Sequence, residues 1–432
     1  MSASPHTSRL LPRRALAVLG GLTLALAPAV TATPAATAAA APERLALSPT
    51  ADPSDSQTVT WRTSGEAEAV LEIAPAATPD QVQVVQGERT GSINGGVYHR
   101  ATVSGLTPDT TYRYRVGDGA DAVSEWQTFT TAAETAQPFD FLYFGDVQND
   151  ITEGAAPVIE AALADASEAE LAVHPGDLIN TAESDSEWAE WYDAFGTEAT
   201  AGMNHVTTPG NHEYKVWSVS DYWPLQFPGA GNGPDDDDLE NTVYYTDYQG
   251  VRFISLNANY VNAPWLDIVD WLEDQEYWLR TVLENNPNDW TVVTFHQPMF
   301  SNEPDRSNGP LRWMWLDVLE EYNVDLVLQG HDHSYGRGNL TANRTDDPAV
   351  QTGPVYVVAV TGPKMYDVDD SNWVNNGAEA RVQLADTQTY QVVSVDGNQM
   401  DYVAKTIDGS IVDSFTITKD AESKRVTDTN VG

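Results

Sequence analysis

The sequence predicts a mixed α/β fold in which two packed β-sheets are flanked by helices and preceded by a small all-β sandwich domain. Two observations support this. Over residues 43–132, short runs of alternating apolar and polar residues are separated by turns, which is typical of a β-sandwich. From residue 138 to 418, strand-like apolar runs alternate with helical patterns before a β-rich last third. Residues 419–432 are expected to form a tail.

The sandwich region contains six strand-like runs and no catalytic grouping. The stretch 105–114 resembles the corner of fibronectin type III and related sandwiches, and His99 stands alone, which favours a packing or surface role. A linker follows at 132–138. The runs are SQTVTWRT (56–63), EAVLEIA (68–74), QVQVVQG (81–87), GVYHRATVSG (96–105), TTYRYRVG (110–117) and SEWQTFTT (124–131).

The second region begins with a strand at 139–145 and a helix at 154–166. The helix expected at 184–195 starts at a Ser or Asp cap and places Trp188, Tyr192 and Phe195 on one face. Further helices are expected at 277–283 and 311–322. Further strands are expected at 170–176, 205–210, 251–257, 290–295, 324–330, 353–362, 390–395, 400–406 and 414–419.

The first 41 residues have the features of a cleavable export signal. They contain three arginines and no acidic residue, followed by the apolar run ALAVLGGLTLALAPAV and a small-residue stretch. The apolar run is too short, and too rich in Gly and Pro, for a comfortable membrane span. The pair Arg13 and Arg14 fits twin-arginine export as well as an ordinary Sec signal. We therefore expect a secreted or cell-envelope protein without stable membrane insertion.

Composition limits the partners and the chemistry. The 432 residues include no cysteine, which excludes disulfides and thiolate metal sites. The 22 basic and 64 acidic residues give a formal charge of −42, which becomes about −45 once the three arginines of the signal are removed. Such a surface repels nucleic acid and anionic lipid, and it resembles surfaces adapted to high salt. Small substrates are expected, nucleic acid is not, and halophily is a hypothesis.

Six side chains suited to metal binding follow strand-like runs. They are Asp146, Asp177, Asn211, His296, His331 and His333, in the blocks GDVQ, GDLIN, GNHE, FHQP and GHDH. Ligands gather beyond the carboxyl ends of strands, and the glycines before three of these residues allow a sharp turn. Two carboxylates, one amide oxygen and three imidazoles suit two ions that activate water for attack on a phosphate ester. His212, which follows Asn211, is the candidate proton donor to the leaving group.

This ordered series of blocks resembles the calcineurin-like metallophosphoesterase superfamily. Together with the leading sandwich, it is most similar to the purple acid phosphatases and their bacterial relatives, over about residues 44–418. The resemblance implies the four-layer sandwich of that superfamily and two divalent or trivalent ions, either Fe, Mn or Zn. It implies that Asp177 bridges the ions and that His212 donates the proton. The implied ligands are Asp146 and His333 for the first ion, and Asn211, His296 and His331 for the second.

Two positions depart from the family pattern. Purple acid phosphatases have a Tyr three residues after the bridging Asp, where this chain has Asn180, and the wider superfamily has a His where this chain has Gln148. Either residue, or water, could complete the first site. Because the missing tyrosinate is what colours the purple enzymes, we expect a colourless protein for which iron is not obligatory.

Several other polar residues have competing interpretations. Arg306 or Arg312 could bind phosphate in place of the histidines of plant enzymes, or both could be ordinary surface residues. His174 and His205 are expected to be structural or to support the ligands. The acidic runs at 235–238 and 367–370 lack the Gly and distal Glu of an EF-hand loop, which favours solvated loops.

The sequence therefore predicts an exported phosphoesterase with two metal ions that hydrolyses phosphate esters, foremost monoesters, by attack of a metal-bound hydroxide. Two alternatives within the fold are a phosphodiesterase or nucleotide hydrolase, and a surface binding protein whose phosphatase site has degenerated. A secreted nuclease is disfavoured by the charge. Substrate choice depends on the loops at 216–247 and 300–310, whose conformation the sequence does not predict.

Overall fold

The structure, a computed structural model, describes residues 41–430 apart from 121, 263–267, 305 and 421–422. The predicted export signal, except for its last residue, lies outside the described residues. None of the helices in the described part is long and apolar enough to cross a membrane.

The N-terminal region forms the predicted β-sandwich. One sheet has the strand order β1-β2-β6-β5 and the other β4-β3-β7-β8. Trp61, Leu71, Tyr114 and Phe129 are buried in its core. β1 and β5 were not anticipated, and β5 is a largely polar strand (ERTGSI) without apolar alternation. The strands are β1 (Glu43–Ser48), β2 (Ser56–Thr63), β3 (Val70–Pro75), β4 (Gln83–Gln86), β5 (Glu88–Ile93), β6 (Gly96–Ser104), β7 (Thr111–Gly117) and β8 (Gln127–Thr130).

One sheet of the sandwich continues into the second region. β1 pairs in parallel with β11, with Leu47 opposite Asn204, so the described strands form the order β19-β25-β24-β23-β22-β9-β10-β11-β1-β2-β6-β5. Beside this junction the side-chain amides of Gln57 and Asn204 exchange hydrogen bonds of 2.9 and 3.1 Å. The added strands are β9 (Phe139–Tyr143), β10 (Leu171–His174), β11 (Asn204–Thr207), β19 (Val350–Gln351), β22 (Tyr390–Asp396), β23 (Gln399–Lys405), β24 (Ile411–Lys419) and β25 (Lys424–Asn430).

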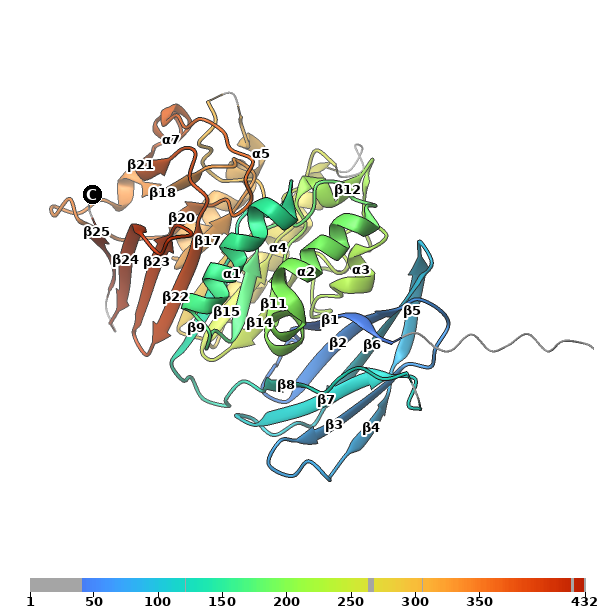
Figure 1. The fold of residues 1–432 in the computed structure, drawn as a ribbon. Helices are drawn as coiled ribbons and strands as arrows, with labels where there is room; N and C mark the ends of the chain where they lie inside the picture. Colours follow the sequence, from blue (N-terminus) through green and yellow to red (C-terminus); the bar gives the residue numbers. More distant parts are fainter. Residues whose placement is uncertain (1–40, 121, 263–267, 305, 421–422, 431–432) are drawn as a thin grey trace, which may run out of the picture. The chain divides into compact units, whose positions relative to one another are not determined.

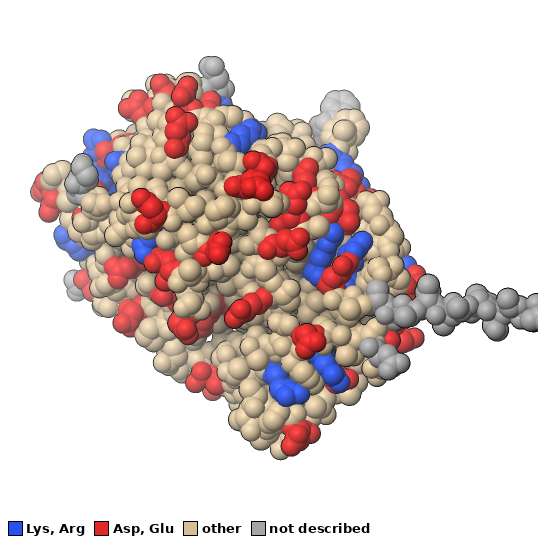
Figure 2. Space-filling view, in the orientation of Figure 1, with Lys and Arg blue, Asp and Glu red and all other residues tan. Residues whose placement is uncertain are grey.

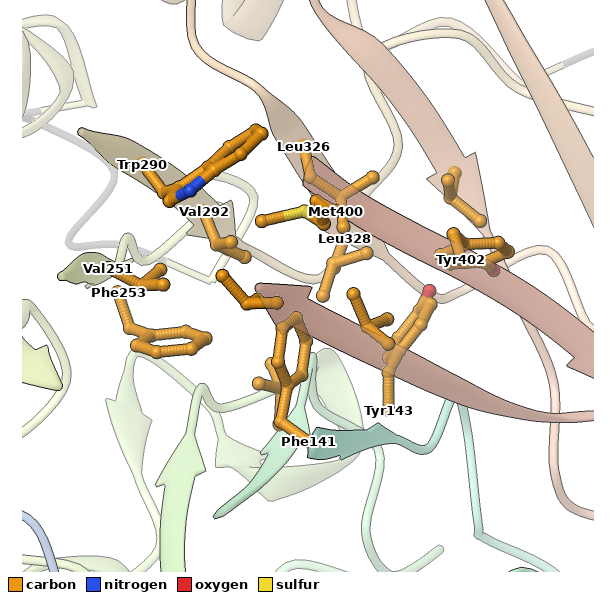
Figure 3. Close-up of a cluster of buried hydrophobic side chains, with 14 of the residues drawn as sticks. Phe141, Tyr143, Val251, Phe253, Trp290, Val292, Leu326, Leu328, Met400 and Tyr402 are labelled. Carbon is orange, nitrogen blue, oxygen red and sulfur yellow. The ribbon is translucent and has the colours of Figure 1, made fainter. Parts of the chain in front are cut away.

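A second sheet, with the order β14-β15-β16-β17-β20-β18-β21, packs against the first. Between them lies an apolar layer that includes Phe141 and Tyr143 from β9, Phe253 from β15 and Leu328 from β17 (Figure 3). The strands are β14 (Tyr244–Tyr248), β15 (Val251–Ser255), β16 (Trp290–Thr294), β17 (Leu326–Gln329), β18 (Tyr335–Leu340), β20 (Val355–Val358) and β21 (Ala378–Leu384).

Helices cover the outer faces of both sheets (Figure 1). Val158, Trp188 and Trp223, from α1, α2 and α3, pack against the first sheet. Trp271 and Trp315, from α4 and η3, pack against the second. The helices are η1 (Ile151–Ala155), α1 (Ala156–Asp165), α2 (Asp185–Gly202), η2 (Asn211–Glu213), α3 (Trp223–Gln226), α4 (Ile268–Glu284), α5 (Gly309–Leu311), η3 (Arg312–Leu316), α6 (Asp317–Glu321), η4 (Thr341–Asn343) and α7 (Ser371–Asn375). The predicted arrangement of two packed sheets between helices is confirmed.

Two smaller features differ from expectation. The segment expected to be a tail contains β25, which pairs with β24 and buries Lys424 and Val426. A short hairpin of β12 (Tyr214–Lys215) and β13 (Ser218–Val219) follows η2.

The N-cap expected near residue 184 is Ser184, whose hydroxyl accepts a hydrogen bond from the Glu187 main-chain N–H.

Candidate metal centre

The six predicted ligands follow strands whose carboxyl ends meet. β9, β10 and β11 are parallel neighbours in the first sheet, and β16 and β17 are parallel neighbours in the second. His296 Nδ1 lies 3.9 Å from Asp146 Oδ1, so the two sheet edges come together at this point. The first sheet supplies Asp146, Asp177 and Asn211, and the second supplies His296, His331 and His333.

Glycines allow this close approach for two different reasons. Gly176 has a φ of +109°, which other residues rarely adopt, so the expected sharp turn before Asp177 is present. Gly210 does not need an unusual backbone. A Cβ there would lie 2.1 Å from Asp177 Oδ1, so only glycine leaves room for that carboxylate.

His296 Nε2 is the centre of one group of side chains, here termed the second group. It lies 3.1 Å from Asp177 Oδ2, 3.2 Å from Asn211 Oδ1 and 3.1 Å from His331 Nδ1. The other ring nitrogen of His296 faces the Pro175 carbonyl at 3.1 Å, which orients the ring. Four side chains from four strand ends thus converge on one point.

The other group, here termed the first group, also contains Asp177. His333 Nε2 lies 3.3 Å from Asp146 Oδ2. Gln148 Nε2 donates a hydrogen bond to Asp177 Oδ2 at 2.7 Å and lies 3.0 Å from His333 Nε2. Asn180 is not part of the group, because its Oδ1 accepts a hydrogen bond from Asn149 Nδ2 at 2.7 Å. Of the two residues that could complete the first site, only Gln148 therefore lies in it.

The donor atoms of both groups fit metal ions. Asp177, His296 and His331 offer ligand atoms within 4.8 Å of one another, and so do Asp146, Asp177 and His333. Asp146 Oδ2 and Gln148 Oε1 are buried and have no hydrogen-bond partner among the described residues. A buried, unpartnered carboxylate oxygen is costly unless a cation lies beside it. Asp177 belongs to both sets, which fits a bridging carboxylate.

The electrostatics of the groups also favour a cation. Burial raises the pKa of Asp146 to about 7, and the Asp177 charge adds to this effect against His296. Burial lowers the pKa of His333 to about 3 and that of His331 well below its usual range. His296 differs, because the two carboxylates outweigh its burial and raise its pKa to about 9. Asp146 is therefore hard to ionise beside Asp177 with only His296 as a counter-charge, and a metal ion would supply the missing positive charge.

Glu213, which sequence reasoning missed, holds the Asp177 loop in shape. Its buried carboxylate accepts main-chain hydrogen bonds from Asp177, Leu178, Ile179 and Gly210 at 2.7–3.2 Å. Asp177 needs this support because its φ of +52° lies in the left-handed region, which costs roughly 1–2 kcal/mol. The only signal in the sequence was the position of Glu213 at the end of GNHE.

His212 lies beside the second group with one ring nitrogen fixed. Its main-chain N–H donates to Asp177 Oδ1 at 2.9 Å, and its Nδ1 lies 2.6 Å from the Asn180 carbonyl oxygen. Because a carbonyl only accepts, Nδ1 carries the proton and Nε2 is left for a substrate. The side chain is half-buried. His212 can therefore reach solvent and bound substrate in a way that the fully buried His296 cannot.

The remaining described histidines are packed in the protein interior. His174 Nε2 and His205 Nδ1 are 2.9 Å apart, and the His174 ring stacks on Phe144. His99 stacks on Trp61 with ring centroids 5.4 Å apart and contacts the Thr63 hydroxyl. None of these three belongs to a group of side chains in the described region that could share an ion.

The two candidate arginines have different surroundings. Arg306 Nη1 donates to the His331 carbonyl at 2.6 Å and to Asp332 Oδ1 at 2.7 Å. Arg312 instead donates to the Met299 carbonyl at 2.7 Å. The acidic runs at 235–238 and 367–370 contribute to none of the candidate ion sites found among the described residues.

Comparisons with known proteins agree with the two-part fold. Residues 42–131 match the family model described as "Purple acid Phosphatase, N-terminal domain", and residues 139–335 match the calcineurin-like phosphoesterase model. The structure of purple acid phosphatase PPD1 from yellow lupin (Lupinus luteus) seeds superposes with a TM-score of 0.68 at 18% identity, covering 88% of this chain and 75% of that one. That likeness supports the fold.

The relatives are more distant in sequence. Purple acid phosphatase 23 of Arabidopsis thaliana is 26% identical over 63% of this chain and 64% of its own length. An uncharacterized protein of Mycobacterium tuberculosis is 29% identical over 56% of this chain and 50% of its own length. The chain thus spans less than two thirds of the length of these relatives. The two family models match one after the other, so the chain resembles a purple acid phosphatase N-terminal domain followed by a calcineurin-like phosphoesterase domain.

Proposed function

We propose that this protein is a metal-dependent hydrolase of small phosphate esters, foremost phosphomonoesters. One observation carries the proposal: two groups of buried side chains share Asp177 and lie where the carboxyl ends of both sheets meet. The match to the calcineurin-like phosphoesterase model supports the same reaction class. A pair of bound ions would acidify a water molecule and neutralise charge on the phosphoryl group.

We assign the residues to two ions. Asn211, His296 and His331 would hold the second ion, while Asp146 and His333 would hold the first, with Asp177 shared. Gln148 would join the first ion through Oε1 once its amide is turned over, since Nε2 is the atom that faces Asp177. The oxygen and nitrogen donors suit Fe, Mn or Zn. Since this chain has Asn180 at the position where purple acid phosphatases have the metal-binding tyrosinate, the metal-replete protein is expected to be colourless. A charge-transfer band in its visible absorption spectrum would contradict this assignment.

His212 is assigned to proton transfer. Its Nδ1–H is held by the Asn180 carbonyl, which turns Nε2 toward the side where an ester would lie. An imidazolium in this position can give its Nε2 proton to the leaving alkoxide. The Asp177 carboxylate, which accepts the His212 main-chain N–H, keeps the two residues in register. His212→Asn should therefore slow esters with poor leaving groups far more than p-nitrophenyl esters.

We further propose that the protein works outside the cytoplasm, on small substrates and not on nucleic acid. The basic, apolar and small-residue pattern of residues 1–41 supports export, and the formal charge of −42 disfavours polyanions. The working division remains a sandwich at 43–132 and a catalytic region at 138–418. Mass spectrometry of the protein secreted by its native host tests the cleavage near residue 41.

The test of the proposed function compares two substrates. Purified protein is loaded with Zn²⁺, Mn²⁺ or Fe and assayed with p-nitrophenyl phosphate and bis-p-nitrophenyl phosphate. We expect the monoester to be the better substrate and Asp177→Asn to lower turnover by on the order of 10³-fold or more. Preference for the diester would change the substrate class. Undiminished turnover by Asp177→Asn would refute the assigned centre.

A further inference from the structure

Arg306 is tied to the loop that carries two of the predicted ligands. Its Nη1 donates to Asp332 Oδ1 and to the carbonyl of His331, and Asp332 stands between His331 and His333 in the chain. Asp332 is itself held by the Ser301 hydroxyl at 2.9 Å and by the Asn302 main-chain N–H at 2.6 Å. The guanidinium is therefore fixed beside the metal centre.

Most of this guanidinium remains available. The side chain is 25% exposed, and among the described residues neither Nε nor Nη2 has an acceptor. Asn211, His212 and His331 are the partly exposed members of the centre, whereas Asp146 and His296 are fully buried. Of these partly exposed members, His331 is the one whose main-chain carbonyl Arg306 contacts.

A second cation lies at the same rim. The Lys364 carbonyl faces His333 Nδ1 at 3.0 Å, and its ammonium is 5.3 Å from the centre of the Tyr366 ring. That ring lies 4.9 Å from the His333 ring, and the Arg306 guanidinium is 5.8 Å from the ring centre on Tyr366. Tyr366 therefore has a cation near it from each of two loops, both adjacent to the first group.

These cations are unusual for this chain. The sequence has 22 basic against 64 acidic residues, and acidic side chains are spread over the face drawn in Figure 2. A surface of that sign repels a phosphate ester at a distance. A local pair of cations at the mouth of the centre would counter this repulsion where the substrate enters.

We propose that Arg306 binds the phosphoryl group of the substrate through Nε and Nη2, and that Lys364 adds positive charge beside it. This proposal rests on the proposed function. A guanidinium with two free N–H groups on one edge matches two phosphate oxygens. Asp332 keeps the fork in place, so little side-chain entropy is lost on binding. Arg312 has no such role, because it is bonded to Met299 and contacts none of the site residues.

The experiment measures binding of inorganic phosphate to metal-loaded protein by calorimetry, together with KM, kcat and metal content. Arg306→Gln removes the charge and the fork, Arg306→Lys keeps the charge alone, and Arg312→Gln is the matched control. We expect Arg306→Gln to weaken phosphate binding and raise KM by on the order of 10- to 100-fold with the metal content unchanged. Arg306→Lys should fall between it and the wild type, and Arg312→Gln should match the wild type.

Two results would overturn the proposal. One is phosphate affinity in both Arg306 variants equal to that of the wild type. The other is loss of affinity only in step with loss of metal, which would mean that Arg306 merely supports the ligand loop. The proposed function can fail independently. Wild-type protein that binds phosphate through Arg306 but hydrolyses no ester would support the phosphate contact of Arg306 and refute the hydrolase activity. Wild-type protein that binds metal but no phosphate would refute the phosphate contact of Arg306.

Discussion

The two halves of the metal centre are built from different donors. The second group brings two imidazoles and the Asn211 amide to the shared Asp177, whereas the first group brings the Asp146 carboxylate, one imidazole and the Gln148 carboxamide. Imidazole nitrogen suits zinc, while oxygen donors suit harder ions such as manganese. The difference teaches that the two groups, at one edge of the fold, offer different donor sets, from which we expect two ions of unequal affinity.

The largest effect is expected when one imidazole is removed from each group in turn. His331→Ala should lose the second ion and His333→Ala the first, each with activity lowered by on the order of 10²-fold or more. Metal analysis after dialysis, with turnover of p-nitrophenyl phosphate, checks both. If either variant retained two ions and near-normal turnover, its histidine would not be a ligand.

The first group, which we expect to bind its ion more weakly, is tested by adding an imidazole to it. Gln148→His supplies an imidazole to the first group and should tighten Zn²⁺ binding there by about tenfold, equivalent to about 1.4 kcal/mol. Gln399→His is the matched control, since that side chain is exposed at the start of β23. Calorimetric titration with Zn²⁺ checks the change. Equal gains in both variants would show that Gln148 has no special place in the first group.

An effect on folding stability, not on metal binding, is expected from the support beneath Asp177. In Glu213→Gln, the new amide group would face two main-chain N–H donors in a buried site, which costs about 3 kcal/mol of unfolding free energy. Denaturant unfolding of the metal-free protein measures it, with the half-exposed Glu183→Gln as the control. An unchanged midpoint would mean that the loop holds its strained backbone without this carboxylate.

The last prediction concerns the pH dependence of stability that comes from a buried histidine outside the metal centre. Burial lowers the pKa of His205 to about 4, so the unfolded chain binds the extra proton more readily between about pH 6.5 and 4. Stability from this residue is complete above pH 6.5 and falls by about 3 kcal/mol as the pH drops to 4. His205→Gln should flatten that part of the stability profile. An equally steep profile in the variant would assign the acid sensitivity to other groups.

Local patterns were enough to predict most of the fold and which side chains would meet at its edge. The runs at 139–145, 170–176, 205–210, 290–295 and 324–330 contain strands, and their ends bring together all six predicted ligands. This succeeded because a buried strand followed by a polar residue is visible in a short window of sequence.

Long-range features could not be predicted in this way. The parallel pairing of Leu47 with Asn204 joins segments more than 150 residues apart, and no local pattern marks it. The same holds for the choice between Gln148 and Asn180, and between Arg306 and Arg312, since each depends on which neighbour the folded backbone brings within hydrogen-bonding distance. Glu213 was missed because its partners are main-chain N–H groups, which leave no trace in side-chain chemistry.

The central claim is a pair of unequal ion sites that share Asp177. The most direct measurement is a calorimetric titration of metal-free protein with Zn²⁺, with metal analysis of the product. We expect two ions per chain bound in two steps, with the tighter step lost in His331→Ala and the weaker step lost in His333→Ala. A single ion per chain, or loss of the tighter step in His333→Ala, would contradict the account.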